Sequence, residues 1–411
     1  MKLFYSIFAF ILCFISCSDD FSNKEEITSK KSPIEIEEIV IRISNSFISS
    51  RNSTEEFIYP NYYGGMYTND KGELIVLIKG NIETGKKDII KRAKCDNFKT
   101  EQCEYSFNEL NELNTKLSDL LCKGDFPDEI TWNGVGILVD KNKISIDLEI
   151  CSDHNIQLFK RLICDSPAIV FGHGTPIIIN APVDSSSIRR DNNNLRNTTL
   201  INPGGEFSTN GVSNDFTFKG SIGFKGIRNG KKGFVTASHC IPKLANTGAG
   251  EYRPVYLNNS HIGNCVITLY TSGLDLAFVE LKNEYETSNT TEWSKKVLTN
   301  KIVSISSLQS LSVTMNGIST NSNYKSGKIL AVEKTKTIEN KLTPIGPIKF
   351  TAKHLVFAQY PSQSGDSGGI VYTPAGNIAG VHCGSGSSAD YGQHAFFTYA
   401  IHINSLGVKL Y

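Results

Sequence analysis

Glycine is distributed unevenly along this chain, and that unevenness limits the fold more than any other feature. Residues 1–200 contain 10 of the 34 glycines, whereas residues 201–411 contain the other 24. Glycine-rich sequence with short strand patterns and frequent turns is typical of an all-β barrel or sandwich. In the first half, by contrast, leucines recur at helical spacing from Ser106 to Leu121, and residues 135–148 have the pattern of a β-hairpin. The sequence therefore predicts an α+β part followed by an all-β part.

Length and charge narrow the class of protein. At about 150 residues per domain, a chain of 411 residues predicts two or three domains. Apolar residues make up 39% of the chain, which is enough for hydrophobic cores and excludes a disordered protein. The formal net charge is +1, from 42 Lys and Arg against 41 Asp and Glu. That balance indicates neither a nucleic-acid partner nor binding to an anionic membrane, and we expect a monomer.

The first 17 residues are typical of a secretory signal peptide (residues 1–17). Lys2 precedes an apolar stretch from Leu3 to Ile15, which is too short for a membrane anchor. Two outcomes stay open for Cys17: it becomes the acylated first residue of a lipoprotein, or it is removed with the signal. In both cases we expect export, with the protein either secreted or anchored to the cell surface through Cys17.

The rest of the chain divides at two polar stretches. Residues 18–56 are polar and predict an N-terminal linker, and residues 181–200 are polar, aperiodic and open to proteolysis, which predicts a processing linker. Between them lies an α+β part at 57–180, and after them an all-β part at 201–411. Export makes the cysteines disulfide candidates, and because no CxxC pair occurs we expect no metal site and no cofactor.

Three short segments of the all-β part carry side chains suited to nucleophilic catalysis. They are Lys232–Cys240 (KGFVTASHC), Ser272–Leu281 (SGLDLAFVEL) and Ser362–Tyr372 (SQSGDSGGIVY). A serine hydroxyl needs a base within hydrogen-bond reach, and histidine titrates in the right range. The imidazole in turn needs a buried carboxylate to fix its tautomer. The sequence offers His239, Asp275 and Ser367 for these roles.

Together the three segments resemble the chymotrypsin-like serine proteases, in particular the bacterial branch that contains α-lytic protease and the streptogrisins. The chain order His, Asp, Ser, with separations of 36 and 92 residues, is the order of that family. The resemblance implies a double six-stranded β-barrel over residues 201–411. It assigns catalysis to His239, Asp275 and Ser367, and it assigns the oxyanion hole to the backbone amides of Gly365 and Ser367.

The resemblance also implies an activity and a disulfide. The expected activity is that of a serine endopeptidase, which hydrolyses protein or peptide substrates through an acyl-enzyme. Cys240 and Cys265 correspond to the family disulfide that closes the loop behind the catalytic histidine. A catalytically silent binding protein with the same barrel stays open as the alternative from another class.

Residues around the nucleophile suggest which side chain precedes the scissile bond. No acidic residue occurs between Lys353 and Gly365, so trypsin-like specificity is rejected. The segment IAGVHCGS resembles the glutamate-specific bacterial members, in which a histidine binds the substrate carboxylate. That comparison assigns His382, Ser364 and Ser385 to the pocket and predicts a preference for acidic residues. Two alternatives stay open, namely small or apolar specificity, and a His382 that is satisfied by a backbone carbonyl inside the barrel.

The α+β part at 57–180 resembles the pro-region of the same bacterial branch. The resemblance implies that it acts as an intramolecular chaperone and inhibitor of a protease made as a zymogen. The mature enzyme is then expected to begin between Leu200 and Gly204. No glutamate occurs between Val183 and Gly205, so a strictly glutamate-specific enzyme could not cut itself there.

Overall fold

The computed structural model describes the chain from residue 31 onward, with short gaps. The described residues are 31–49, 56–179, 183–184, 199–210, 217–241, 253–269, 273–320, 322–340, 348–388 and 391–411. The predicted signal peptide, Cys17 and most of the predicted processing linker lie outside them. We call residues 31–179 the front part and residues 199–411 the back part; both belong to one compact unit.

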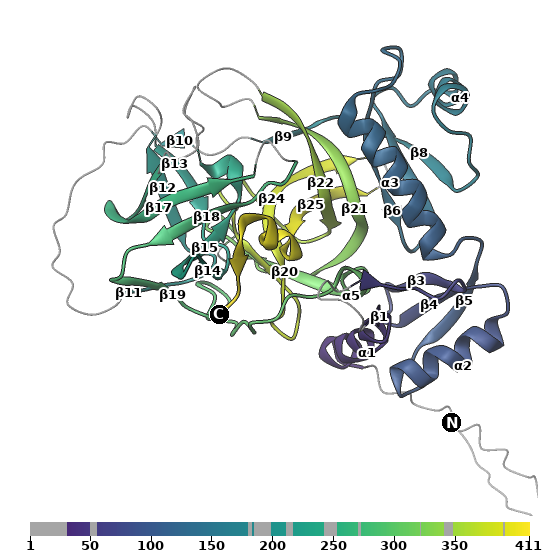
Figure 1. The fold of residues 1–411 in the computed structure, drawn as a ribbon, viewed down its shortest axis with the longest axis horizontal. Helices are drawn as coiled ribbons and strands as arrows, with labels where there is room; N and C mark the ends of the chain where they lie inside the picture. Colours follow the sequence, from purple (N-terminus) through teal and green to yellow (C-terminus); the bar gives the residue numbers. More distant parts are fainter. Residues whose placement is uncertain are drawn as a thin grey trace, which may run out of the picture. The chain divides into compact units, whose positions relative to one another are not determined.

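The back part forms two antiparallel β-barrels (Figure 1). The sheet of the first barrel has the strand order β10-β13-β12-β16-β17-β18-β15-β14-β26. Its strands are β10 (Val183–Asp184), β12 (Glu206–Asn210), β13 (Thr217–Ser221), β14 (Lys225–Arg228), β15 (Lys231–Thr236), β16 (Arg253–Leu257), β17 (Ser260–Thr268), β18 (Ala277–Leu281) and β26 (Val408–Lys409). Alternation of apolar residues in these strands fills one core, which includes Phe207, Phe234 and Phe278.

The second barrel is built from β20 to β25. These strands are β20 (Ser312–Asn316), β21 (Gly327–Asn340), β22 (Ile348–Ala358), β23 (Ile370–Tyr372), β24 (Ile378–Ser388) and β25 (Gly392–Tyr399). The sheet order is β20-β23-β24-β25-β22-β21, and the additional pairing of β20 with β21 closes the barrel. The expected fold, an all-β double barrel preceded by an α+β region, is confirmed.

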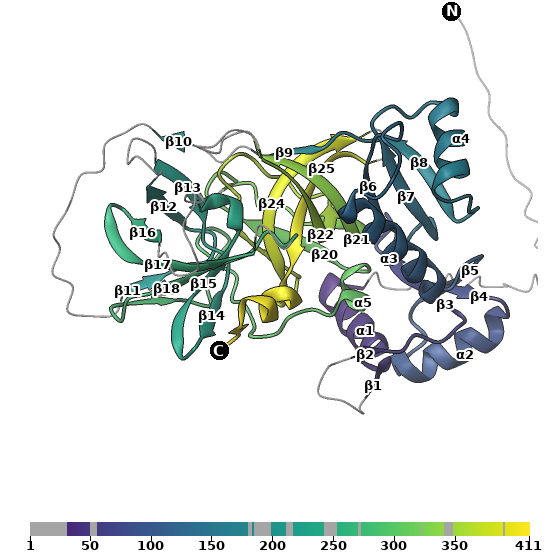
Figure 2. The same ribbon diagram turned by 45° about the horizontal axis from the view of Figure 1, so that its top comes forward.

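Strands of the front part continue this second sheet beyond β21. They are β6 (Trp132–Leu138), β7 (Lys143–Leu148) and β8 (Ile169–His173), in that order, while β9 (Ile177–Ile179) pairs with β21 in parallel. The pairing of β6 with β21 is antiparallel and places Val332 opposite Ile137. Both ribbon views show β6 beside β21 (Figures 1 and 2). The sequence analysis treated the two parts as separate and did not foresee this shared sheet.

Helices and a small sheet complete the front part. The helices are α1 (Pro33–Asn45), α2 (Ile82–Ala93), α3 (Phe107–Lys123) and α4 (Asp153–Leu162), and the sheet is β3 (Tyr63–Thr68), β4 (Leu74–Lys79) and β5 (Lys99–Cys103). Short strands β1 (Ile48–Ser49) and β2 (Glu56–Phe57) pair with each other. The expected helix after Ser106 begins with a capping box between Ser106 and Glu109, and the expected hairpin is β6–β7.

Helix α1 contradicts the expectation of a polar linker at 18–56. Ser32 and Glu35 form a capping box, and Pro33 occupies the first turn. Ile36, Ile39, Val40 and Ile43 recur at helical spacing and are buried. The prediction was wrong for these residues because the surrounding charged side chains masked an amphipathic pattern.

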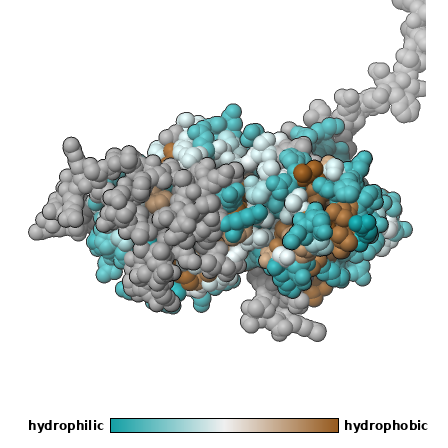
Figure 3. Space-filling view, turned by 90° about the horizontal axis from the view of Figure 1, so that it is seen from above, coloured by the Kyte–Doolittle hydropathy of each residue, from teal (hydrophilic) through white to brown (hydrophobic). Residues whose placement is uncertain are grey.

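Hydrophobic residues reach the surface of the front part around α4 (Figure 3). Ile150, which precedes this helix, and Leu162, its last residue, are 62% and 43% exposed. None of the described helices is long and apolar enough to cross a membrane. In the described part of the chain, no group of three or more His, Cys, Asp or Glu side chains is placed to hold a metal ion.

Candidate active site

Pairing between two strands of the first barrel brings His239 and Asp275 together. His239 lies in a short 3-10 helix, η1 (Ser238–Cys240), just after β15, and Asp275 lies just before β18. In the β15–β18 ladder Thr236 is opposite Ala277, so the two side chains leave the same end of the sheet. The consecutive apolar residues that follow Asp275 are buried in the barrel core and fix this position.

Two hydrogen bonds, one from the imidazole and one from the backbone amide, join His239 to the Asp275 carboxylate. His239 Nδ1 lies 2.6 Å from Asp275 Oδ2, and the His239 backbone amide donates to Asp275 Oδ1 at 3.0 Å. Burial lowers the pKa of His239, but the charge of Asp275, the nearby Cys240 and the hydrogen bonds to both together raise it to about 10. Such a pair holds Nδ1 protonated and leaves Nε2 to accept a proton.

Ser367 lies at the start of the turn before β23 and packs against the histidine segment. Its carbonyl oxygen accepts from the amide of Ser221 at 2.7 Å and from the thiol of Cys240 at 3.4 Å. The Ser367 hydroxyl donates to the Cys383 carbonyl at 3.4 Å, and the buried Nε2 of His239 has no hydrogen-bond partner. The structure therefore brings the three residues to one place but leaves the serine–histidine hydrogen bond unformed.

The loop before Ser367 forms a cradle of backbone amides. Gly365 has φ +101° and Gly368 has φ +88°, which are backbone conformations that favour glycine. The Asp366 carboxylate is fully buried and accepts from the amides of Ser319 (2.8 Å), Thr320 (3.0 Å) and Gln363 (2.7 Å). Within the described residues, the amides of Gly365 and Ser367 donate to no backbone carbonyl or side chain.

Ser221 of β13 is an anchor of this loop that the sequence analysis missed. Its hydroxyl donates to the Gly365 carbonyl at 2.9 Å and accepts from the Ile318 amide at 3.0 Å. The pairing of Ser221 with the loop joins the two barrels at the site. No local sequence pattern could have revealed it, because the contact spans 144 residues of chain.

The expected disulfide between Cys240 and Cys265 is not formed, and this expectation is corrected. Both are free buried thiols. Cys240 is directed to the Ser367 carbonyl, whereas Cys265 on β17 is directed to the Ile267 carbonyl at 3.6 Å. The sulfur atoms therefore serve two different local contacts.

Cys383 contacts the site through its backbone carbonyl, which accepts from the Ser367 hydroxyl. Its sulfur lies 3.1 Å from Thr398 Oγ1 on β25. Burial raises the pKa of Asp275, but His239 and, more weakly, a hydrogen bond from the Cys383 thiol lower it to a net value below the ordinary one.

The predicted pocket residues lie at different depths. His382 is buried, with 1% of its surface exposed, while Ser364 and Ser385 are exposed. His382 Nδ1 lies 2.9 Å from the hydroxyl of Tyr360, a partner that the sequence analysis did not name. Burial lowers the pKa of His382 to about 3, with the nearby His239 adding to the effect, so this imidazole is neutral at neutral pH.

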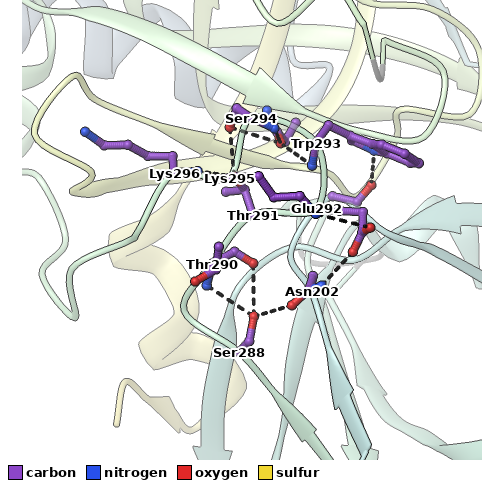
Figure 4. Close-up of polar contacts among 11 residues, drawn as sticks. Asn202, Ser288, Thr290, Thr291, Glu292, Trp293, Ser294, Lys295 and Lys296 are labelled. Carbon is purple, nitrogen blue, oxygen red and sulfur yellow. Dashed lines mark hydrogen bonds and ion pairs between the residues drawn. The ribbon is translucent and has the colours of Figure 1, made fainter.

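The segment after the predicted processing linker is already held in place. Strand β11 (Thr199–Ile201) pairs in parallel with β19 (Tyr285–Thr287). Figure 4 shows Asn202 between Ser288, which donates to its Oδ1, and Glu292, which accepts from its Nδ2 at 2.6 Å. The Trp293 indole donates to the Gly204 carbonyl at 2.9 Å. A cut on the N-terminal side of Asn202 would keep the contacts of Asn202 and Gly204 in the back part, whereas β11 would go with the N-terminal fragment.

Comparisons with known proteins agree with this geometry. Residues 210–406 match the family model described as Trypsin, residues 22–103 the Pro-like N-terminal domain, and residues 108–174 the Pro-like C-terminal domain. A search of curated proteins gave no match.

Solved structures similar to the chain include Thermobifida fusca Protease A (20% identity, TM-score 0.38) and a Nocardiopsis protease (22%, 0.38). They cover 52% of this chain, and the match spans 98% and 99% of their own chains. A glutamic acid specific serine protease that uses a histidine triad in substrate binding is 19% identical, with TM-score 0.38 and coverage of 51% and 100%. On the three family models and the described fold, the chain carries a chymotrypsin-like serine endopeptidase domain preceded by a two-part Pro-like region.

Proposed function

We propose that the chain is an exported zymogen whose back part cleaves peptide bonds with His239, Asp275 and Ser367. The observation that carries the proposal is the His239–Asp275 pair, locked by two hydrogen bonds, beside a serine whose loop offers two free amides. Ser367 attacks the substrate carbonyl while Nε2 of His239 takes the hydroxyl proton. The same imidazole then gives that proton to the leaving amine, and water hydrolyses the acyl-enzyme with His239 again as base.

Burial of the site supports the zymogen part of the proposal. His239, Asp275 and Ser367 are 4%, 0% and 7% exposed, whereas a peptide substrate needs an open approach to the serine and the histidine. The serine also donates to Cys383 rather than to the base. Activation would then involve uncovering these side chains and turning the Ser367 hydroxyl toward Nε2, with the Pro-like region serving as intramolecular chaperone and inhibitor until cleavage.

A serine-directed fluorophosphonate tests the proposed chemistry. We expect covalent labelling of the processed protein and no labelling of a Ser367→Ala variant, because the reagent reacts with a serine that a neighbouring base activates. Ser405→Ala is the matched control, since it removes an exposed hydroxyl outside the proposed site and should label like the parent. Equal labelling of parent and Ser367→Ala, or no labelling of a processed and folded parent, would favour the silent binding protein.

For specificity we propose a preference for glutamate before the scissile bond, with His382, Ser364 and Ser385 around the substrate carboxylate. The support is chemical: an imidazole and two hydroxyls can offer hydrogen bonds to one carboxylate without a permanent buried cation. Small or apolar specificity is the second candidate. The burial of His382 and its contact with Tyr360 favour that candidate, because both could hold the ring as a structural part of the barrel.

Replacing His382 with alanine separates the two candidates. If His382 binds the substrate carboxylate, we expect turnover of Glu substrates to fall by at least about tenfold to a hundredfold, the loss of one charge-assisted hydrogen bond. Fluorophosphonate labelling should persist, and Tyr360→Phe should retain a preference for Glu. Digestion of a peptide library, read by mass spectrometry, gives the preference directly. Unchanged cleavage after Glu in His382→Ala would assign specificity to other residues.

A further inference from the structure

Helix α1 carries one carboxylate that is completely buried. Glu37 has 0% of its surface exposed, although Glu35 and Glu38 on the same helix are exposed. A buried carboxylate is strongly destabilising unless donors surround it. The position of Glu37 on the inner face of α1 therefore requires a receiving site in the neighbouring structure.

That receiving site lies on the protease domain, in the turn between β23 and β24. Glu37 Oε1 accepts from the Thr373 hydroxyl and from Asn377 Nδ2 at 2.7 Å, and Oε2 accepts from the Ala375 amide at 2.9 Å. All three donors are neutral and all belong to the back part. They match a carboxylate, which only accepts hydrogen bonds.

Other contacts hold the three donors in this arrangement. Thr299 donates to Asn377 Oδ1 at 2.6 Å, so the Asn377 amide must turn its NH₂ group toward Glu37. The backbone amide of Asn377 donates to Thr373 Oγ1 at 3.2 Å and so closes the turn. Lys296 Nζ donates to the Pro374 carbonyl at 2.6 Å. The site is therefore built by the protease domain itself.

One side of the contact made by α1 borders a cavity. Beside Glu37 a cavity of about 960 Å³ separates Ile41, Asn45 and Ile48 from Glu333, His354 and His402. The turn also lies at the opposite end of β23 from Ser367, so it is separate from the active site.

We propose that the β23–β24 turn is a carboxylate-binding site of the protease domain, and that Glu37 docks there to hold the Pro-like region at a place remote from catalysis. This rests on the proposed zymogen. It means that the Pro-like region is fastened at its first helix as well as through the shared sheet. The site takes a carboxylate presented from a helix, and it becomes empty when α1 leaves.

Hydrogen exchange of the full chain in a Ser367→Ala background tests this, because no activity or processing is needed. In Glu37→Gln, an NH₂ group replaces one acceptor and meets the donors of the turn. We expect the amides of residues 33–45 to exchange about tenfold to a hundredfold faster, as expected for loss of a charged hydrogen-bond set. Glu38→Gln, the exposed neighbour on the same helix, should exchange like the parent.

A compensating change makes the test specific for the contact. In the double variant Glu37→Gln with Asn377→Asp, the glutamine NH₂ can donate to the new carboxylate, and protection of residues 33–45 should return. Protection in Glu37→Gln equal to that in Glu38→Gln would overturn the proposal. So would faster exchange spread equally over β24 and β25, or a double variant without recovery. The parent chain with Ser367 could fail to react with fluorophosphonate while the Ser367→Ala variants show the exchange pattern described above. The docking site would then be supported, and only the proposed catalysis would be contradicted.

Discussion

Asp275→Asn is expected to lower kcat/KM of the processed enzyme by about 10⁴-fold, the size that loss of the triad aspartate has in serine proteases. Asp275 Oδ2 accepts from His239 Nδ1 at 2.6 Å. An asparagine that turns its NH₂ group to Nδ1 would force the ring proton onto Nε2, and Nε2 could then no longer accept the proton of Ser367. The measurement is steady-state hydrolysis of a chromogenic peptide at matched active-site concentration.

The pH profile provides a second readout of the same variant. Asp275 raises the pKa of His239 against the effect of burial, and catalysis needs the neutral imidazole, so parent activity is lost as pH falls through that raised pKa. Without the carboxylate the pKa falls, and the acidic limb of kcat/KM should move to lower pH while the plateau drops. Glu280→Gln, on β18 close to Asp275 in sequence, is the control and should match the parent. A fall of less than about tenfold in Asp275→Asn would remove this residue from the proposed mechanism.

The residues that could be placed from sequence are those whose position is set by local pattern. Asp275 precedes an apolar run, and that run became β18 with its side chains in the barrel core. Gly365 and Gly368 flank a serine, and both adopt the positive φ that this turn requires. In each case the neighbouring residues alone determine the backbone, so the local sequence was sufficient.

The features that the sequence did not reveal depend on contacts between distant segments. Ser221 anchors the serine loop from 144 residues away, and Val332 pairs with Ile137 across the boundary between the two parts. The prediction of a Cys240–Cys265 disulfide was wrong for the same reason. A family resemblance suggests which cysteines pair, but it does not determine which atoms each thiol contacts in this chain. Helix α1 is a different case, because its apolar residues are separated by charged side chains, and only the local capping box at Ser32 marks its start.

Asp147→Ala should have the largest effect on stability, because it leaves two buried lysines without their counter-charge. Asp147 on β7 contacts Lys334 Nζ at 2.9 Å and Lys336 Nζ at 2.7 Å, both on β21 of the protease domain. The lysine side chains are 0% and 5% exposed. On β6, Gly134 is opposite Asp147, and a Cβ added there would lie only 2.3 Å from Asp147 Oδ2. The glycine therefore leaves the space that the Asp147 carboxylate occupies. Removing one partner of a buried ion pair costs about 3–5 kcal/mol.

The expected result is a fall of that size in the free energy of unfolding, with faster hydrogen exchange in β6, β7 and β21. Burial raises the pKa of Asp147, but Lys334 and Lys336 lower it by more, so its net pKa is below the ordinary value. The stabilisation is then fully present above the unfolded pKa of about 3.9 and is lost only as pH falls further. Denaturation of the Ser367→Ala chain at pH 7 therefore measures all of it.

Two controls separate the charge cluster from general damage to the shared sheet. Asp140→Ala, at the exposed turn of the same hairpin, should change stability by less than about 0.5 kcal/mol. The triple change Asp147→Leu, Lys334→Met and Lys336→Met removes all three charges together, and it should recover most of the lost stability because no uncompensated ion remains buried.

If Asp147→Ala is as stable as Asp140→Ala, the lysines must reach solvent in the folded chain, and the ion pairs do not hold the front strands on β21. If the single change is damaging and the triple change restores stability, the cluster fixes which strands join rather than how tightly they join. The Pro-like region would then owe its alignment on the protease domain to one carboxylate placed between two ammonium groups.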